Sequence, residues 1–495
     1  MPHTTIMDTQ HPDYDVTIDA VHLVRDTIEG PNAVKNGPRS KVYLPNPTDT
    51  EILNSQDKLE SNNNYATYKS RAEFDGFPAR TESGYMGALK STPPALDKIP
   101  SDIEYLILDS DGDGLTLSES IEITQANLLE VKFHGLLADF NGLTDNDINN
   151  ESKQLTQAQA KAAGLKATIK HYPRESIKDW DYGVVNNQNQ LTYVKLSEKT
   201  SEINRETFER VEVENQLILG LDEDGFYFQM QITVDDKGVE VKSEMLYPEN
   251  NGGKMDFIPF EIVIEQKKQS SALPRALGIL YPVCLKAVDR YQVKADLKYS
   301  LLKDAQPTLK SSGWDERKNE LFIKMNPNGA VLGSGQHIAV PFGVEMEYLQ
   351  WDADSNAMFK YLEENQKEAK ALGARFDTSD PKEEAVGVAK IRSAEELSAL
   401  MNTQTATQES YIRVMTWCFW YMSTNTDIPE IELVLNKEFN KVILTPEERK
   451  AILDDFMGTI IDHEEAVRQL VKGGTMTPDE AEELLTRMSN SGGFS

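Results

Sequence analysis

Two stretches with helical character, separated by a short β-rich stretch, determine the fold that we predict for this chain. The first, RALGILYPVCLKAVDRYQVKADLKYSLLK at 275–303, is followed by Pro307, which ends a helix. The second, MFKYLEENQKEAKALG at 358–373, ends on a glycine suited to the C′ position. Between them, ELFIKM at 320–325 and HIAVPF at 337–342 predict short strands. A long helix out, a small insert and a long helix back indicate a stalk with a tip.

The segments before the stalk predict a mixed α+β protein. Residues 1–60 are polar and lack a sustained period, so we expect an arm with little structure of its own. An amphipathic helix is expected through Leu128, Leu129, Val131 and Leu136. Alternating residues between about 191 and 264, with Asp- and Gly-rich turns, predict a small antiparallel sheet joined by hairpins.

The segments after the stalk are predominantly helical. Ser393 and Glu396 match a capping box and predict a third long helix over about 393–422. From about 430 onward the tail is predicted to be helical, with helix starts at Thr445 and Thr477, each followed by Pro and an acid.

The composition limits the class of protein. The 495 residues allow about three domains and a stable core without disulfides or metal. With 51 Lys and Arg against 81 Asp and Glu, the formal net charge is -30, which argues against a protein that holds nucleic acid through its overall charge. Cys284 and Cys418 form neither a disulfide framework nor a structural zinc motif, so we expect an intracellular protein with two buried thiols.

No targeting or membrane segment is expected. The amino terminus lacks a cationic head followed by an apolar stretch, and no segment is apolar for the ~20 residues that cross a bilayer. The sequence therefore predicts no membrane partner.

The acidic loop DSDGDG at 109–114 resembles the first half of an EF-hand. Asp109, Asp111 and Asp113 occupy the first three acidic positions, with Gly114 at position 6. Position 12, which should provide a bidentate Glu, is Ser120. A solvated Asp-Gly turn is the simpler interpretation, and a Ca²⁺ site remains an alternative; no other cofactor is predicted.

No catalytic motif is apparent, so we do not expect an enzyme. The seven histidines form no zinc-binding spacing, and no Gly-x-Ser-x-Gly elbow is present. The glycines at 329–335 lack the Gly-Lys-Ser/Thr ending of a phosphate-binding loop, and a hairpin turn explains them.

The first stalk helix carries a stripe of cations that is unusual in so acidic a chain. The four cations recur every four residues and so lie along one slowly turning face of the helix. Salt bridges to an acidic neighbour are one interpretation, and a strip facing phosphates or a partner subunit is the other. The four residues are Lys286, Arg290, Lys294 and Lys298.

Several stretches, in order over roughly 60–430, resemble the portal proteins of tailed bacteriophages, also called head-to-tail connectors. These are the early Tyr-x-x-Tyr-x-x-Arg-Ala-x-Phe with Arg80-Thr81 and 84–89, FHGLLAD at 133–139 ending a helix, MDFIPF at 255–260, RYQVKAD at 290–296, QPTL at 306–309, and ALGAR at 371–375.

The resemblance implies a portal fold. It would comprise an arm (1–60), a wing of helices plus antiparallel sheet (61–271), a two-helix stem (272–303 and 352–372) and a small α/β clip (304–351). A channel loop (373–392), a long wing and channel helix (393–429) and a helical crown (430–495) would follow.

The resemblance also implies a function and partners. The chain would form a ring, usually of twelve subunits, at one capsid vertex of a virion assembled in the host cytoplasm. Viral double-stranded DNA would pass through without sequence-specific binding. Terminase, the major capsid and scaffolding proteins, and head-completion or tail adaptor proteins would be partners.

The same resemblance assigns candidate residues. The DNA channel would include the four stripe cations together with Asp377, Asp380, Lys382, Glu383, Glu384 and Lys390. The clip would dock partners through Trp314, Arg317, Lys318 and Lys324.

A second hypothesis from another class is a calcium-stabilised structural or adhesive protein that uses the loop at 109–114. The acidic balance and this loop are its only support. A ring with a central hole in negative-stain images would favour the portal, and monomers or rods would favour the second hypothesis.

Overall fold

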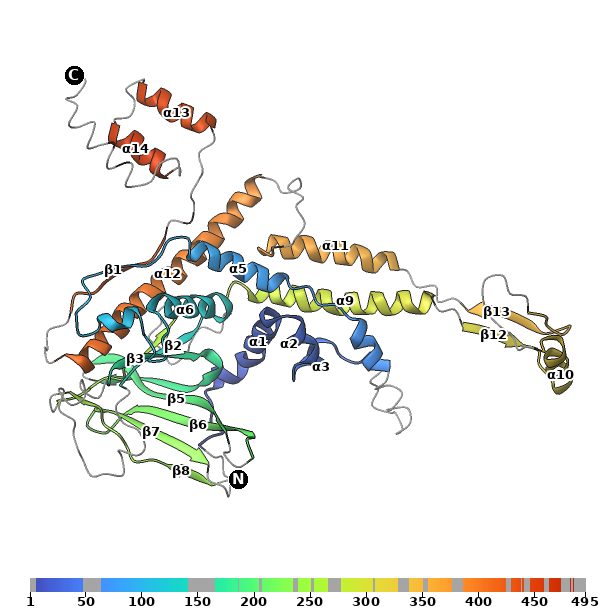
Figure 1. Ribbon diagram of the computed structural model, residues 1–495, viewed down its shortest axis with the longest axis horizontal. Helices are drawn as coiled ribbons and strands as arrows, with labels where there is room; N and C mark the ends of the chain where they lie inside the picture. Colours follow the sequence, from blue (N-terminus) through green and yellow to red (C-terminus); the bar gives the residue numbers. More distant parts are fainter. Residues whose placement is uncertain are drawn as a thin grey trace.

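The computed structural model consists of a mixed α+β body from which a long two-helix projection extends to a small separate tip (Figure 1). The α+β class predicted from the sequence is therefore observed. The structure describes residues 6–47, 64–140, 165–185, 187–203, 207–234, 239–250, 253–265, 277–305, 308–327, 338–349, 355–375, 386–423, 429–437, 439, 446–457, 463–472, 481 and 484.

The amino-terminal segment is helical and packed against the body, so the prediction of a weakly structured arm is wrong over this part. Helices α1 (Pro12–Glu29), α2 (Pro31–Asn36) and α3 (Ser40–Tyr43) follow one another closely. His11 caps α1 by accepting a hydrogen bond from the Asp13 amide, and Gly30, at φ +106°, ends it. A few apolar side chains anchor these polar helices, with Val21 and Val24 fully buried.

Two helices and a three-stranded sheet form the centre of the body. Helix α5 (Phe77–Leu89) follows a helical segment at 64–71, and α6 (Leu117–Val131) begins with a capping box formed by Thr116 and Glu119. Strands β2 (His134–Phe140), β3 (Ala167–Pro173) and β11 (Phe260–Val263) pair antiparallel in the order β11-β2-β3.

The helix predicted to continue through Leu136 ends earlier. Lys132 adopts a left-handed conformation at φ +55°, and the chain enters β2 two residues later. Gly135 in β2 allows close packing, since a Cβ there would lie 2.4 Å from the Phe260 ring. The 133–139 stretch is therefore mostly strand, and its expected place at the end of a helix is wrong.

The predicted antiparallel sheet with hairpins is confirmed over β5 to β8, but its bounds differ: a fifth strand, β4, precedes the predicted range, and β11 at the end of that range belongs to the three-stranded sheet. The order β4-β5-β6-β7-β8 of the five-stranded sheet follows the sequence. Short strand pairs β1 with β14 and β9 with β10 lie outside it. The bounds are β4 (Ile177–Val185), β5 (Gln188–Ile203), β6 (Arg210–Leu221), β7 (Tyr227–Val234), β8 (Glu240–Lys242), β1 (Ala95–Asp97), β14 (Glu432–Val434), β9 (Glu249–Asn250) and β10 (Gly253–Lys254), with 3-10 turns η1 (Glu104–Ile107) and η2 (Arg174–Ser176).

Helix α12 (Val386–Met422) crosses the three-stranded sheet and packs against α6. Its buried residues Tyr411, Val414 and Cys418 share one apolar core with α6, β2 and β3. The helix start predicted at Ser393 is wrong, because α12 begins seven residues earlier and takes in residues assigned to the channel loop. Helices α13 (Pro446–Met457) and α14 (His463–Lys472) lie apart from the sheets in Figure 1.

The projection consists of α9 (Tyr281–Ala305) and α11 (Ser355–Ala371), and we call these two helices the stem. The tip consists of β12 (Thr308–Ser312), α10 (Glu316–Met325) and β13 (Glu345–Leu349), with β12 and β13 paired antiparallel. The strand predicted at 320–325 is wrong, since these residues are helical and Asp315 caps the helix by accepting the Lys318 amide at 2.8 Å. Among the described residues of the other predicted strand, 338–342, no strand is present.

Candidate functional site: the stem and its tip

The two stem helices lie side by side and run in opposite directions (Figure 1). The 25 residues of α9 correspond to a length of about 37 Å. Polar contacts join the helices: the Asn365 amide donates to Asp289 at 2.8 Å, and the Arg290 guanidinium donates to the Leu362 carbonyl at 2.7 Å. The stalk and tip inferred from the sequence thus correspond to real elements.

The inner part of the stem is embedded in the body. Val283, Ala287 and Tyr291 of α9 belong to an apolar core that also contains residues of the amino-terminal segment and of α11. The Tyr68 hydroxyl donates to Asp296 at 2.6 Å. Only the outer part of the stem therefore projects freely.

The cation stripe of α9 is neutralised within the same chain. Arg290 and Lys294 both donate to the Asp75 carboxylate at 2.7 Å, and this group is only partly exposed. Lys286 pairs with Glu368 of α11, and Lys298 pairs with Glu73 at 2.6 Å. The salt-bridge interpretation of the stripe is therefore confirmed.

Asp75 is the centre of this ionic cluster. Burial acts to raise the pKa of Asp75, but the hydrogen bonds from Lys294 and Arg290 and their charges outweigh it, so that the pKa is lowered. Asp75 lies in the segment that leads into α5, so the cluster fastens the stem to the body. The sequence contains no local signal for this role, because Asp75 is 215 residues away from Arg290.

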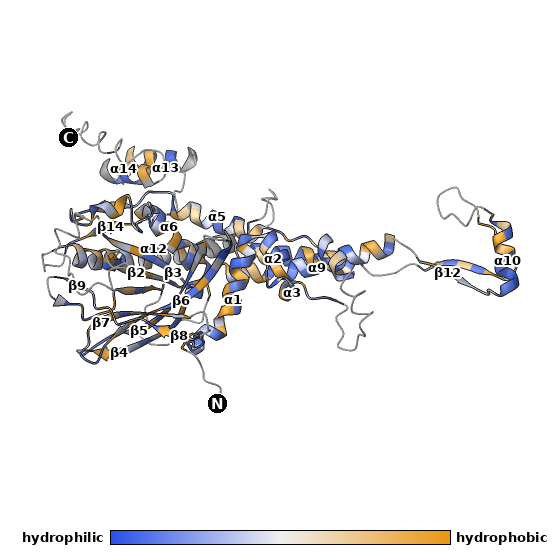
Figure 2. Cartoon of the chain, turned by 60° about the horizontal axis from the view of Figure 1, so that its bottom comes forward, coloured by the Kyte–Doolittle hydropathy of each residue, from blue (hydrophilic) through white to orange (hydrophobic). Residues whose placement is uncertain are grey.

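The tip leaves apolar side chains uncovered. None of the residues of α10 is buried, although Leu321, Ile323 and Met325 lie on it with exposed fractions of 42%, 62% and 48%. Phe342, beside the strand β13, is fully exposed. Figure 2 shows hydrophobic residues on α10, well separated from the body.

The four predicted docking residues of the tip lie together on and just before α10. The Trp314 ring packs edge-on against Phe322 at 5.1 Å between centroids. Lys318 donates to the Gly313 carbonyl at 2.8 Å and so closes the loop before the helix. Arg317 and Lys324 are exposed. Lys318 has a local structural role, Trp314 is partly buried against Phe322, and Arg317 and Lys324 are available at the surface.

The acidic loop uses its carboxylates to hold its own backbone. One oxygen of Asp109 accepts the amides of Gly112 and Gly114 at 2.9 and 3.0 Å. One oxygen of Asp111 accepts the amides of Asp113 and Leu115 at 2.8 and 3.1 Å. Within the described ranges, no group of three or more His, Cys, Asp or Glu side chains is arranged to hold a metal ion. These bonds form an Asp-Gly turn, and the Ca²⁺ alternative stays a prediction.

Most of the residues predicted for the channel loop fall outside the described ranges. These are Asp377, Asp380, Lys382, Glu383 and Glu384, while Lys390 belongs to α12. Just before them, the Arg375 amide donates to Thr81 at 3.0 Å, and its guanidinium lies over the Tyr85 ring and against Gly84. The chain is thus attached to α5 at this point, a contact that sequence reasoning missed.

A buried chain of hydrogen bonds links α6 to β3 and β2 and was also missed. Ser120 bonds His171 at 2.8 Å, and His171 bonds His134 at 2.9 Å. The arrangement is similar to a nucleophile, a base and an orienting group, but Ser120 and His134 are fully buried, so no substrate can reach them. Burial lowers the pKa of His171 to about 4, which keeps the ring neutral. The chain of bonds is therefore structural.

Both cysteines are buried, as predicted. Burial raises the pKa of Cys284 to about 12, so its thiol is protonated at neutral pH. In the part of the chain that the structure describes, no helix combines the length and the hydrophobicity that a membrane span requires.

The chain is similar to one protein family over part of its length and to several solved structures. A family model described as "Domain of unknown function (DUF4055)" matches residues 283–422, which run from the stem to the end of α12. No curated protein matches the chain.

Solved structures similar to this chain include two from gene transfer agent (GTA) particles. One chain comes from "Virion of native gene transfer agent (GTA) particle", with 10% identity, a TM-score of 0.36, and coverage of 80% of this chain and 88% of that one. Another comes from "Neck of empty GTA particle computed with C6 symmetry", also with 10% identity and a TM-score of 0.36, and coverage of 81% and 90%. A similarity this low carries no argument about function.

Proposed function

We propose that this chain is a portal protein: a non-enzymatic subunit that forms a ring at one capsid vertex and provides the channel for packaging and ejecting viral DNA. The observation that carries the proposal is the stem with its tip. A helix pair that projects from the body and ends in a helix with no buried residue and several exposed apolar side chains is poorly explained in an isolated monomer.

In a ring, the tips of neighbouring subunits would lie next to one another around the axis, and their exposed apolar side chains could then pack together. Neighbouring tips would cover one another's Leu321, Ile323 and Phe342, and burial of apolar side chains stabilises association by about 25 cal/mol per Å². The inner stem needs no such cover, because it already packs against the body. Projections from neighbouring subunits would thus bring the exposed apolar residues of their tips together.

The charge of the chain suits a channel that does not retain its cargo. A lumen that neutralised many phosphates would bind DNA with a strongly salt-dependent affinity. This chain has a net charge of -30, and the four stripe cations of α9 are paired internally. DNA would therefore be repelled from the wall and would pass without sequence-specific contacts.

The proposal includes the partners that the resemblance implies. Twelve copies would surround the viral DNA. Terminase, and later the head-completion or tail adaptor proteins, would dock on the tip through Trp314, Arg317 and Lys324. The body would contact the major capsid and scaffolding proteins in a virion that is assembled in the host cytoplasm.

Negative-stain microscopy and mass measurement of the purified chain test the proposal. We expect rings with a central hole and a mass near twelve subunits. The double variant Ile323→Ser/Phe342→Ser should shift the population toward single chains, whereas Leu108→Ser, which removes an equally exposed apolar side chain from the body, should not. A wild-type chain that remains monomeric over the whole accessible range of concentration and salt contradicts the proposal, as would ATP hydrolysis by the pure chain.

A further inference from the structure

A buried lysine of the five-stranded sheet binds the segment that precedes α1. Lys195 of β5 is fully buried, and its ammonium donates to the Ile6 carbonyl at 2.8 Å, to the Thr9 carbonyl, and to the Thr9 hydroxyl at 2.9 Å. A lysine is rarely fully buried unless its charge is compensated. Here three oxygens of the amino-terminal segment provide that compensation, so the lysine and the segment depend on each other.

The two edge strands of the same sheet hold this segment as well. On β4, the His11 ring stacks on Trp180 at 4.2 Å between centroids, and the His11 amide donates to the Lys178 carbonyl at 2.9 Å. On β8, the Glu240 carboxylate accepts the Met7 amide at 2.7 Å. The segment therefore lies across the sheet, and α1 begins directly after it.

The first half of α1 is bound to the turn η2, which follows β3 of the three-stranded sheet and precedes β4 of the five-stranded sheet. The Tyr14 hydroxyl donates to the Glu175 carbonyl at 3.1 Å. The buried Arg174 donates to the Thr17 hydroxyl at 2.9 Å. These bonds fix the start of α1 at the junction between the two sheets.

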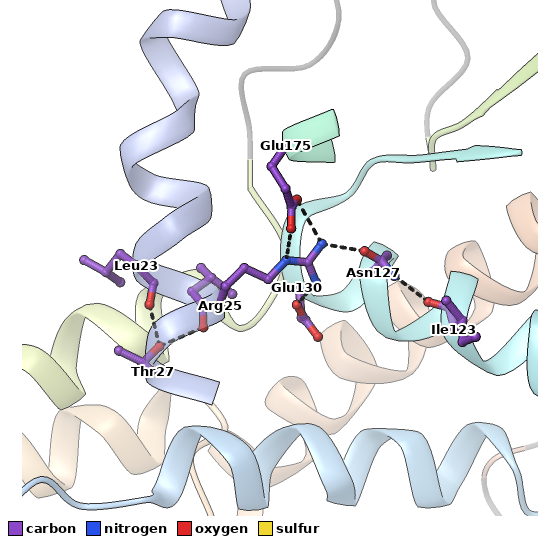
Figure 3. A network of polar contacts seen from close by, with 8 residues as sticks. Leu23, Arg25, Thr27, Ile123, Asn127, Glu130 and Glu175 are labelled. Carbon is purple, nitrogen blue, oxygen red and sulfur yellow. Dashed lines mark hydrogen bonds and ion pairs between the residues drawn. The ribbon is translucent and has the colours of Figure 1, made fainter. Parts of the chain in front are cut away.

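A single guanidinium binds the other end of α1 to α6 (Figure 3). Arg25 donates to Glu130 and Asn127 of α6, and it also pairs with Glu175 of η2 at 3.2 Å. The Glu130 side chain is only 8% exposed. A buried carboxylate needs a paired cation, so Arg25 fixes the position of α1 relative to the last turn of α6.

The last turn of α6 holds the entrance to the stem. The Gly278 amide donates to the Glu130 carbonyl at 3.1 Å, and the Leu280 amide donates to the Leu129 carbonyl at 3.4 Å. The contact is so close that a Cβ at Gly278 would lie 1.9 Å from the Leu129 oxygen. Val24 of α1 shares an apolar core with Leu129 and Leu280. The end of α1 that carries Arg25 is therefore also the end that reaches the stem.

We propose that residues 6–29, which we call the brace, couple the five-stranded sheet mechanically to the entrance of the stem. The helical part of the brace has 18 residues and so spans about 27 Å as one rigid element. Lys195 holds it at one end and Arg25 at the other, so loosening either end loosens both. A partner that displaces the sheet would thereby shift the stem. The proposal concerns a single chain and holds whether or not the chain forms a ring.

Hydrogen exchange of the full-length chain at neutral pH, measured by mass spectrometry, tests the brace. Lys195→Met keeps the length of the side chain but leaves buried acceptors without a donor, so peptides from 6–11 should lose about tenfold in protection factor. Peptides that contain Gly278 and Leu280, at the far end, should lose at least about threefold. Arg25→Lys keeps the charge but not the planar fork, so it should give the larger loss at Gly278 and the smaller loss in 6–11.

Control variants separate the coupling from a general loss of structure. Lys199→Met, an exposed lysine of the same strand, and Lys41→Met, an exposed lysine of α3, should behave like the wild type. Peptides from β7 should not change in any variant. If Lys195→Met does not fold, Thr9→Val, which removes one acceptor at an exposed position, is measured with the same expectation. Losses confined to the mutated end, or losses that spread equally to β7, overturn the proposal.

Discussion

Replacing Asp75 by Asn should loosen the attachment of the stem to the body. Asp75 accepts hydrogen bonds from Arg290 and Lys294, whose side chains are 13% and 22% exposed, while its own is 30% exposed. Asn keeps the shape but loses the charge, so that two partly buried cations remain uncompensated. A fully buried pair broken in this way costs about 3–5 kcal/mol, and an exposed pair about 0–1 kcal/mol. For this intermediate exposure we expect about 2 kcal/mol.

Hydrogen exchange of α9 measures this loss locally, which suits a chain with several structural units that need not unfold together. A change of about 2 kcal/mol corresponds to a roughly thirtyfold fall in protection for the α9 amides near Arg290 and Lys294. Glu73→Gln is the matched control, because Glu73 pairs with Lys298 of the same stripe but is 67% exposed, and we expect a fall of less than about fivefold.

The same carboxylate predicts a pH dependence with a defined sign. Because the pKa of Asp75 is lowered in the folded chain, its contribution is present above the unfolded pKa and is lost as the pH falls through the folded pKa. Wild-type protection in α9 should fall in acid, and Asp75→Asn should abolish that part of the change. Equal effects of Asp75→Asn and Glu73→Gln would refute the reasoning, since the burial of the cluster would then have no energetic consequence.

Three further predictions concern other parts of the chain. Gly278→Ala should destabilise the chain severely or prevent folding, whereas Gly87→Ala, on α5 with open space around it, should be neutral or stabilising by up to about 1 kcal/mol in thermal unfolding. Millimolar Ca²⁺ should leave the melting temperature unchanged, because Asp109 and Asp111 already bond backbone amides; a rise that Asp111→Asn removes would contradict this. The population of rings should increase with salt or divalent cations, because twelve copies of an acidic chain repel one another; sedimentation showing no dependence on ionic strength would count against it.

The sequence predicted the parts of the fold that depend on local pattern. The stem helices and the strands β6, β7 and β8 follow from helical spacing and from alternation with Gly-containing turns, whereas β4 was not predicted. The helices at 12–43 were missed because a few buried residues, such as Val21 and Val24, anchor segments that are otherwise polar. The end of α6 was misplaced because Lys132, rather than a glycine, adopts the left-handed conformation.

The tip and the ionic clusters show why the rest could not be predicted. The run ELFIKM suits a strand or an exposed helix equally, and Asp315 at the cap decides for the helix. The spacing of the stem cations was visible, but the choice between salt bridges and free charge depended on Asp75 and Glu73, which are distant in the chain. Arg25 and Glu130 carried no pattern at all, because only the packing of α1 against α6 brings their side chains together.

The two ends of the stem make different kinds of interaction, and this difference affects how a ring could assemble. Near the body, charges are neutralised within one chain, so this region gains little from a neighbour. At the tip, α10 and Phe342 present exposed apolar groups that a neighbouring subunit would cover in a ring. Salt screens the repulsion between acidic subunits while leaving apolar contacts intact. Association should therefore begin at the tips, and its salt dependence should persist when Asp75 is replaced by Asn but should disappear, together with the rings, in Ile323→Ser/Phe342→Ser.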